Sequence, residues 1–515
     1  MNRKAHFLWV DDEIDLLRPH VLFLEEKGYS TDCVNNGRDA LAVFSERNYD
    51  IVFLDENMPG LSGLETLTMM HQINPQVPVV MITQNEDEGI MDLAIGKKIA
   101  DYLLKPVNPN QILLSVKKLL NKSELLLQTV SNNYRDAYSD IGEQIARSNS
   151  VEEWKNLYKM LVYWELELEK SGSPMYEMLE MQKVEANISF SRFVRANYAE
   201  WLRDRNVVLS PDVFKKYVFP LMDIGEKLFF ILIDNFRLDQ WDSIKPHLSS
   251  DFDYDEDVFL SILPTATPYS RNSIFSGLMP LELSRIYSDV WVSELSDEGK
   301  NNMESVLIGR MMEAAKRYET FSYHKVNDTY EGKRLVERFS EMERKDLNVI
   351  VFNFIDFFSH ARTESEMLRE LTGDEVSYRS VTTSWIKRSY ITLLLKKVAE
   401  KGYKVIITSD HGSIRVKNPI KVKGDSETGK NVRYKFGKSL AYDPKKVFDI
   451  ISPENFGLPS PNLSTRYIFA QNSDFFVYDN NRNSRLNYYL NSFQHGGISM
   501  EEMMVPIVKL TPKRN

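Results

Sequence analysis

Several features that mark particular classes of protein are scarce or absent in this chain. Cys33 is the one cysteine among 515 residues, so the chain cannot form an internal disulfide, which fits a reducing compartment. No apolar run reaches the roughly 20 residues of a membrane-spanning helix, and the start of the chain lacks the pattern of a signal peptide. The net charge of −10 argues against a general nucleic-acid coat, which needs a basic footprint. We therefore expect a cytoplasmic protein that does not insert into a membrane.

The length and the residue pattern predict three domains, because 515 residues are too many for one hydrophobic core. Residues 1–122 alternate strand-like and helix-like segments, residues 123–208 are helical throughout, and residues 209–515 return to the alternation. The expected fold class is α/β, with a doubly wound first domain, a helical-bundle linker and a second, larger α/β domain.

Four apolar runs in the first domain end directly before polar residues. The runs are His6–Val10, 51–54, 79–82 and 102–104, and the residues that follow them are Asp11 and Asp12, Asp55, Thr83 and Lys105. Since parallel strands place their carboxyl ends at the same edge of a sheet, these polar residues should gather there. Neighbouring carboxylates repel one another unless a cation joins them, and carboxylate oxygens suit Mg²⁺. A lysine and a threonine at the same edge can bind a phosphoryl group.

This pattern resembles the receiver domain of bacterial response regulators, which has the CheY-like fold. The resemblance implies that Asp55 accepts a phosphoryl group from a sensor histidine kinase and that the domain binds Mg²⁺. By the same resemblance, Asp12, Asp55 and the backbone carbonyl of Asn57 hold the ion with Asp11 close by, while Thr83, Tyr102 and Lys105 are the switch hydroxyl, the rotating aromatic residue and the lysine that pairs with the phosphoryl group.

The helical segment repeats apolar residues at three- and four-residue spacing, as in Trp154, Leu157, Tyr158 and Leu161. Residues 171–174, Ser-Gly-Ser-Pro, separate two of its helices. This pattern predicts a small antiparallel bundle. It leaves open whether the bundle also carries a dimer interface or couples the domains mechanically.

The second α/β domain opens with a strand-like run and a threonine-containing turn. Leu228–Ile233 is a run of six apolar residues that ends at Asp234, the pattern of a buried parallel strand with a carboxylate at its ligand-binding end. About thirty residues later, the turn Pro264-Thr265-Ala266-Thr267-Pro268 leads into an expected helix and places a hydroxyl near its N-terminus. A carboxylate and a hydroxyl at neighbouring strand ends suggest metal-assisted phosphoryl chemistry.

Histidine is also scarce, and its placement is informative. Three of the eight histidines follow apolar runs in the second α/β domain: His360 lies four residues after Asp356, His411 follows Asp410, and His495 precedes two glycines. Imidazole and carboxylate groups together favour zinc, with manganese as the alternative. His324 is outside this pattern, in a region that we expect to be helical.

The order of these groups resembles the alkaline phosphatase superfamily, most closely its PglZ branch. The resemblance implies one metal on Asp356, His360 and His495, and a second on Asp234, Asp410 and His411 beside the nucleophile. Thr267 is the expected nucleophile and metal ligand, and Thr265 is the alternative. Arg271 and Asn272 follow it as expected donors to the substrate phosphate.

A basic stretch suggests the substrate. Eight basic residues follow the Asp410-His411 pair: Arg415, Lys417, Lys421, Lys423, Lys430, Arg433, Lys435 and Lys438. Beside a phosphoryl-transfer site they suggest a polyanion such as an oligonucleotide, although a solvated loop explains the charge equally well.

The three domains in this order resemble response regulators of type IX secretion. The resemblance implies a two-zinc phosphodiesterase that acts on linear or cyclic oligonucleotides, controls secretion and forms a homodimer on phosphorylation. The alternative is a signalling adaptor with a structural metal site, whose output is binding to a sigma factor or to the secretion apparatus. No helix-turn-helix pattern is visible, so direct promoter binding is not expected.

Overall fold

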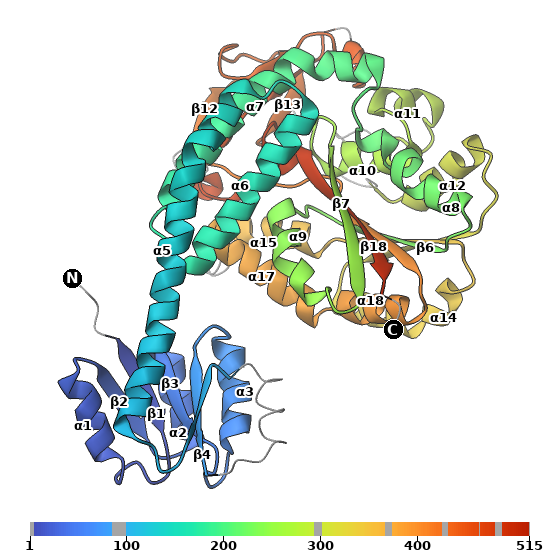
Figure 1. Ribbon diagram of the computed structural model, residues 1–515. Coiled ribbons are helices and arrows are strands. Elements are labelled where there is room, and N and C mark those ends of the chain that lie inside the picture. Colours follow the sequence, from blue (N-terminus) through green and yellow to red (C-terminus); the bar gives the residue numbers. More distant parts are fainter. Residues whose placement is uncertain are drawn as a thin grey trace. The chain divides into compact units, whose positions relative to one another are not determined.

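The structure, a computed structural model, describes residues 5–84, 99–292, 301–365, 373–424, 431–462, 464–478 and 487–513 (Figure 1). The chain divides into two compact units, Met1–Asn133 and Tyr134–Asn515. Helix α5 (Pro109–Arg147) begins in the first unit and ends in the second. In the described part of the chain, no helix combines the length and the apolar composition needed to cross a bilayer.

The first unit contains a five-stranded parallel sheet in the order β2-β1-β3-β4-β5. The strands are β1 (His6–Val10), β2 (Ser30–Val34), β3 (Ile51–Asp55), β4 (Val79–Thr83) and β5 (Asp101–Leu104). The helices described beside it, apart from the start of α5, are α1 (Arg18–Glu26), α2 (Gly37–Glu46) and α3 (Gly63–Ile73). The strand order confirms the doubly wound fold.

Both faces of this sheet are covered, which explains the apolar runs. Leu8 and Val10 pack into one buried cluster with α2 and α3, while Phe7 and Trp9 of the same strand pack into a second cluster with α1 and α5. Because successive strand residues point to opposite faces, only a run that is apolar at every position satisfies both clusters.

The second unit begins with the predicted helical bundle, made of the end of α5, α6 (Val151–Ser171) and α7 (Tyr176–Asp204). Ser150 begins α6 with a capping box to Glu153, and Gly172 ends it in the left-handed conformation (φ 64°), which favours glycine. Trp154, Leu157 and Leu161 are buried, as the apolar spacing predicts.

A six-stranded sheet in the order β7-β18-β10-β6-β9-β8 forms the centre of the second unit. Strands β10, β6, β9 and β8 are parallel, whereas β18 runs antiparallel to both β10 and β7. The strands are β6 (Leu228–Ile233), β7 (Phe252–Leu260), β8 (Phe321–Val326), β9 (Leu347–Phe352), β10 (Lys404–Thr408) and β18 (Met504–Pro512). His324 lies in β8, so the expectation of a helical region there was wrong.

Helices cover both faces of this sheet (Figure 1). Phe230 and Val349 pack on one side against α10 and α12, and Phe229 stacks on the other side against Phe339 at the start of α14. The helices are α8 (Phe219–Asp223), α9 (Leu238–Ile244), α10 (Thr267–Ser276), α11 (Pro280–Ile286), α12 (Glu304–Ala314), α13 (Thr329–Glu337), α14 (Phe339–Met342), α15 (Phe354–Glu364), α17 (Glu375–Arg388), α18 (Tyr390–Glu400) and α20 (Met500–Met503).

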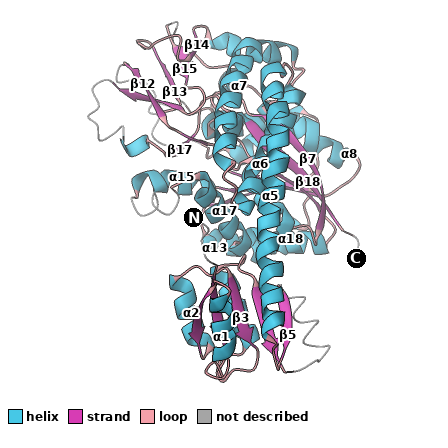
Figure 2. Cartoon of the chain, turned by 60° about the vertical axis from the view of Figure 1, so that its left-hand side comes forward, coloured by secondary structure: helices cyan, strands magenta, loops and turns pink. Residues whose placement is uncertain are grey.

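The segment between β10 and α20 adds short strands that form three small sheets. Several of these strands are labelled in Figure 2. They are β11 (Ile414–Arg415) with β17 (Phe493–Gln494), β12 (Asn418–Val422) with β16 (Asp474–Tyr478), and β13 (Tyr434–Gly437) with β15 (Arg466–Phe469) and β14 (Phe448–Ile450). The pairing of β11 with β17 brings the chain after Asp410 and His411 beside the chain that leads to His495.

Candidate active site

The first unit gathers its predicted carboxylates at the carboxyl ends of β1 and β3. Asp11, Asp12 and Asp55 each offer an oxygen within 4.8 Å of the others. Lys105, which follows β5, places Nζ 3.0 Å from Asp11 and 3.1 Å from Asp55. Burial and the charges of Asp11 and Asp12 raise the pKa of Asp55, against the opposing effect of Lys105.

The other predicted receiver residues lie at the same end of the sheet or close to it. Thr83 is buried at the end of β4, and its carbonyl accepts a 2.8 Å hydrogen bond from the Lys105 N–H. Tyr102 is half-buried in β5, and Asn57 is exposed two residues after Asp55. The arrangement offers oxygen ligands for one divalent cation and a lysine beside the carboxylate of Asp55.

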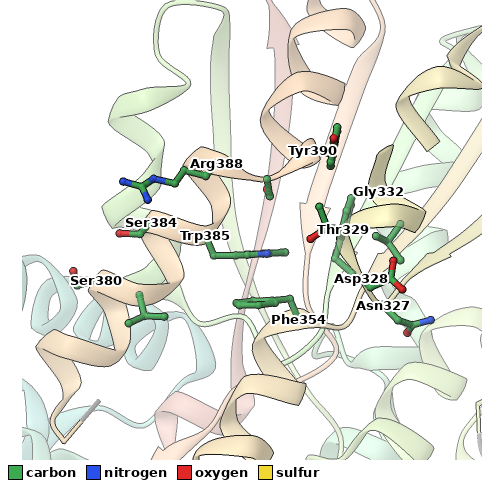
Figure 3. A pocket seen from close by; sticks show the side chains of 14 residues that line it. Asn327, Asp328, Thr329, Gly332, Phe354, Ser380, Ser384, Trp385, Arg388 and Tyr390 are labelled. Atoms are coloured by element: carbon green, nitrogen blue, oxygen red, sulfur yellow. The ribbon is translucent and has the colours of Figure 1, made fainter. Parts of the chain in front are cut away.

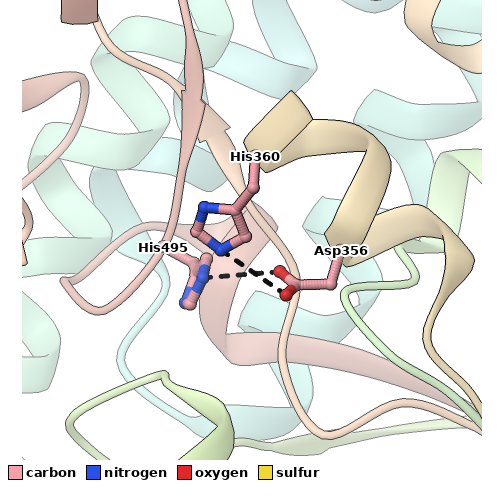
Figure 4. A group of neighbouring side chains, drawn as sticks. All are labelled: Asp356, His360 and His495. Atoms are coloured by element: carbon pink, nitrogen blue, oxygen red, sulfur yellow. Dashed lines mark ion pairs between the residues drawn. The ribbon is translucent and has the colours of Figure 1, made fainter. Parts of the chain in front are cut away.

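The second unit brings together two groups of three residues that suit a metal ion. The first is Asp356, His360 and His495, and the second is Asp234, Asp410 and His411; within each group the ligand atoms lie within 4.8 Å of one another. In the first group, Nε2 of both histidines lies 3.5 Å from an oxygen of Asp356 (Figure 4). The rings of His411 and His495 stack with centroids 4.2 Å apart, so the two groups are adjacent.

The sheet order explains this convergence. Asp234 follows β6, Asp410 follows β10 and Asp356 lies in the first turn of α15 after β9, and these three parallel strands are neighbours. The carboxyl ends of neighbouring parallel strands form one crevice, which is the usual ligand site of an open α/β sheet.

Backbone carbonyls orient two of the histidine rings. Nδ1 of His495 lies 3.1 Å from the carbonyl oxygen of Thr265, and Nδ1 of His411 lies 3.1 Å from that of Gly412. A ring that donates from Nδ1 to a carbonyl keeps the Nε2 lone pair free for a metal ion. Burial and the nearby His411 lower the pKa of His495 to about 3, which favours the neutral, ligating form.

Thr267 lies at the second metal group, and Thr265 does not. Oγ1 of Thr267, at the first position of α10, is 3.1 Å from Nε2 of His411 and 3.4 Å from Oδ1 of Asp234. Oγ1 of Thr265 instead donates to the Gly497 carbonyl at 2.9 Å and accepts the Gly496 N–H at 3.0 Å. The hydroxyl of Thr265 is therefore occupied by the backbone of the turn after His495.

Arg271, the expected donor to the substrate phosphate, contacts three carboxylates in the structure. Its guanidinium is buried, with Nε 3.0 Å from Asp410, Nη1 3.3 Å from Glu304 and Nη2 in an ion pair with Asp234. The local sequence gave no sign of this burial, because the carboxylates that surround Arg271 are distant along the chain. Asn272 is half-buried, and its amide donates to the Pro268 carbonyl at 2.9 Å.

The pKa values of the neighbouring carboxyls Asp234 and Asp410 shift in opposite directions, although Arg271 lowers both. Burial raises the pKa of Asp234 well above its ordinary value, and the charges of Asp410 and Asp356 add to this effect. Burial acts on Asp410 in the same direction, but Arg271 and His411 outweigh it and lower the pKa of Asp410 to about 2. Asp410 is therefore the ionised member of this pair.

Asn235 is a residue of the site that the sequence pattern did not single out. It is buried, has a left-handed φ of 61°, and directs Nδ2 toward Ser359 at 3.3 Å, while its Oδ1 has no hydrogen-bond partner among the described residues. Its position directly after Asp234 at a strand end was the signal that could have identified it, because asparagine tolerates this conformation.

The basic stretch does not form one continuous exposed surface. Arg433 is buried in an ion pair with Glu502, with Nε and Oε1 3.0 Å apart, and Lys435 is buried over the ring of Tyr478. Lys417, Lys421, Lys423 and Lys438 are exposed and Arg415 is half-buried, whereas Lys430 lies outside the described residues. Arg433 and Lys435 are therefore not accessible to a polyanion in this structure.

Comparison with known families identifies the larger domain. The family model of the BREX system PglZ alkaline phosphatase-like domain matches residues 213–510, which is more than half of the chain. The chain belongs to the PglZ family. The PglZ domain is preceded by matches to the PorX response regulator linker domain over residues 124–202 and to the response regulator receiver domain over residues 7–117. Receiver, linker and PglZ domain together give the architecture of PorX, a two-component response regulator with a PglZ output domain.

Similarity to individual curated proteins is partial. ResD of Bacillus subtilis is 26% identical over 42% of this chain and 92% of its own length. The CpxR homolog of Haemophilus influenzae is 35% identical over 25% of this chain, and this chain spans about half of that relative, 56%. Among solved structures, the response regulator TrrA of Thermotoga maritima is 33% identical with a TM-score of 0.21, covering 22% of this chain and 98% of that one.

Proposed function

We propose that the chain is a phosphorylation-switched phosphodiesterase: the receiver domain accepts a phosphoryl group on Asp55, and the PglZ domain hydrolyses oligonucleotides, linear or cyclic. The observation that carries the proposal is the position of the Thr267 hydroxyl, 3.1 Å from His411 and 3.4 Å from Asp234, beside a second group of metal-binding residues. A serine or threonine in such a position is a nucleophile for phosphoryl transfer.

The donor atoms fit two zinc ions. Each group of three combines imidazole with carboxylate, the ligand types that zinc takes in catalytic sites, where three protein ligands leave a fourth position for water or substrate. Zinc ions bound by these residues would supply Lewis acidity, neutralising charge on the phosphate and lowering the pKa of a nearby hydroxyl. In the receiver domain, the all-carboxylate set of Asp11, Asp12 and Asp55 fits Mg²⁺.

The residues of the chain define the steps. Oγ1 of Thr267 gives up its proton to solvent and attacks phosphorus, the bond from phosphorus to the leaving oxygen breaks, and that oxygen takes up a proton from solvent as the first product leaves. Water then attacks the phosphothreonine and releases a phosphate monoester and the threonine hydroxyl. Asp234 and His411 orient the Thr267 hydroxyl. Arg271 positions Asp234 and Asp410 through its ion pairs with them.

Regulation would begin at the receiver. A sensor histidine kinase phosphorylates Asp55, Lys105 pairs with the phosphoryl group, and Thr83 and Tyr102 respond to it. We propose that this shifts the protein from monomer to homodimer. Because the architecture is that of PorX, we extend the proposal to control of type IX secretion.

A diesterase assay tests the enzymatic part. Purified full-length protein with zinc should hydrolyse bis-p-nitrophenyl phosphate and short oligonucleotides in preference to p-nitrophenyl phosphate, and Thr267→Ala should abolish this while the fold is retained. No turnover of any diester by zinc-loaded protein would refute it. The adaptor hypothesis, with a sigma factor or secretion protein as partner, instead expects the cellular phenotype to survive Thr267→Ala and to be lost in Asp55→Ala.

Light scattering tests the switch separately. Acetyl phosphate or beryllofluoride should raise the molar mass of the wild type toward that of a dimer and leave Asp55→Ala unchanged. An unchanged mass for the treated wild type contradicts the proposed dimerisation.

A further inference from the structure

A cavity of about 710 Å³ lies beside the candidate metal groups but contains none of their ligands. It is found at the carboxyl ends of β8 and β9, where Val326 and Phe352 line it, and between the start of α15 and the adjoining ends of α17 and α18 (Figure 3). Ligand pockets in proteins commonly have volumes of about 300–1,000 Å³. The cavity is large enough for a mononucleotide.

An aromatic wall forms the centre of this cavity. Figure 3 shows the rings of Trp385 and Phe354 stacked on one another. Their centroids are 4.3 Å apart and the interplanar angle is 6°. Phe354 covers one face of the indole, and the rest of the half-buried Trp385 borders the cavity. A flat indole surface that Phe354 supports on one face favours a planar aromatic ligand on the other.

The polar groups around this wall are mainly donors. The indole N–H of Trp385, the guanidinium of Arg388 and the hydroxyls of Ser380 and Ser384 have no hydrogen-bond or ion-pair partner within the part of the chain that the structure describes. The one carboxylate in the lining, Asp328, uses Oδ1 to accept the Glu331 N–H at 2.8 Å and cap α13. The cavity therefore suits a ligand rich in acceptors or negative charge.

We propose that this cavity binds a nucleoside phosphate, with the base against Trp385 and the phosphate at Arg388. A purely apolar ligand would make no use of the exposed donors Ser380, Ser384 and Arg388, and inorganic phosphate alone would leave the aromatic wall uncovered. A base supplies a π-face for the indole, and a phosphate supplies two oxygens for the planar guanidinium. The ligand is either a free nucleotide or a nucleoside of the oligonucleotide substrate, since both present this chemistry.

Hydrogen bonds connect the cavity to the metal groups. Asn327, in the cavity lining, accepts a 2.7 Å hydrogen bond from the amide of Asn353, whose own oxygen accepts one of 3.1 Å from Nη1 of Arg271. Arg271 in turn contacts Asp234 and Asp410. In addition, α15 begins with Phe354 of the cavity and carries Asp356 in its first turn. A ligand in the cavity would thus contact elements that position both metal groups.

Calorimetry on the full-length chain in the presence of EDTA tests binding, with AMP, adenosine and inorganic phosphate as probes. We expect AMP to bind with one site per chain. Arg388→Ala should weaken AMP at least tenfold and leave adenosine unchanged, Trp385→Ala should weaken both, and Trp385→Phe should restore most of the affinity. Arg344→Ala is the matched control, because it removes the same charge from an exposed residue outside the cavity.

The proposal is overturned if AMP does not bind, or if it binds the wild type, Arg388→Ala and Trp385→Ala with the same affinity. Because binding is measured without metal and without turnover, this result is independent of whether the chain hydrolyses diesters. Circular dichroism would reveal a loss of folding in Trp385→Ala. In that case Arg388→Ala, which changes an exposed residue, still tests the proposal.

The source of the ligand follows from kinetics on the zinc-loaded protein. If the cavity holds a nucleoside of the substrate, Arg388→Ala raises the KM for an oligonucleotide several-fold and leaves the rate with bis-p-nitrophenyl phosphate unchanged. If it holds a free nucleotide, added AMP changes the rate with bis-p-nitrophenyl phosphate in the wild type and not in Arg388→Ala.

Discussion

Glu165 of α6 accepts a hydrogen bond of 3.1 Å from Nη1 of Arg379 in α17, so a helix of the bundle is joined by buried charges to the PglZ domain. The same Nη1 is 2.6 Å from Asp239, which also binds Arg237. Arg237 donates to the carbonyl of Ser413, two residues after His411. Ion pairs and a final hydrogen bond to the backbone therefore connect the bundle to the segment that carries two candidate metal ligands.

We expect Arg379→Met to be strongly destabilising, because it leaves the carboxylates of Glu165 and Asp239 buried with less compensation. Loss of one partner of a buried ion pair costs on the order of 3–5 kcal/mol. Urea unfolding followed by tryptophan fluorescence measures the change. Arg310→Met is the control: its ion pair with Asp289 is at the surface and should leave the midpoint unchanged. Equal midpoints for the two variants would contradict the structural role of Arg379.

The stability of the second unit should depend on pH through Glu165. Burial acts to raise the pKa of this carboxyl, but the charges of Lys183 and Arg379 outweigh it, so the pKa lies below its ordinary value. A group with a lowered folded-state pKa adds stability above its unfolded-state pKa, about 4.3, and loses it as the pH falls through the folded value. Urea midpoints should therefore decrease below about pH 4, and Glu165→Gln should make this decrease shallower. A slope identical to that of the wild type would be evidence against the coupling.

Substitution of the two threonines should separate chemistry from structure. Thr267→Ala should reduce diester hydrolysis by at least about 10³-fold, as loss of a nucleophile does, with an unchanged melting temperature, and Thr267→Ser should recover part of the activity. Thr265→Ala should lower stability by about 1–3 kcal/mol, because it leaves the Gly496 N–H without its buried acceptor. The assay is initial rate on bis-p-nitrophenyl phosphate together with thermal melting. Full activity in Thr267→Ala would remove it from the mechanism.

Arg271→Met should change how zinc affects stability. Without metal, Arg271 is the buried positive charge that contacts Asp234 and Asp410, so its loss should destabilise the EDTA-treated protein by on the order of 3–5 kcal/mol. Zinc then neutralises the same carboxylates, so the rise in melting temperature on adding zinc should be larger in the variant than in the wild type. Equal rises in the two proteins would show that Arg271 and the metal do not share these partners.

Gly412→Ala should disturb the metal group that contains Asp410 and His411. A Cβ atom at this position would lie 2.0 Å from the carbonyl oxygen of Glu501, so the backbone must move. We expect metal analysis to find one zinc fewer per chain. Gly142→Ala is the matched control, because its Cβ would meet nothing closer than 4.0 Å and alanine favours a helix interior by up to about 1 kcal/mol. Two zinc ions in Gly412→Ala would contradict the expectation.

The sequence was sufficient for features that depend on neighbouring residues. Runs such as Leu228–Ile233 are buried on both faces, so they are apolar at every position, and the polar residue that ends each run marks the carboxyl edge of the sheet. For this reason the order of residues alone places Asp55, Asp234 and the Asp410-His411 pair at the carboxyl edges of the sheets, whereas the receiver and PglZ folds were inferred from the resemblance to these families.

Only the tertiary structure decided which polar groups face the site and which are neutralised inside the protein. Thr265 and Thr267 occupy the same turn, and the sequence could not exclude either as the nucleophile. Their contacts differ because Gly496 and Gly497, more than 200 residues away, bind the hydroxyl of Thr265 and not that of Thr267. Arg271 is buried and paired with Asp410, which is 139 residues away along the chain. Local sequence carries no signal for such partners, because the free energy of burying a charge depends on contacts that exist only after the chain has folded.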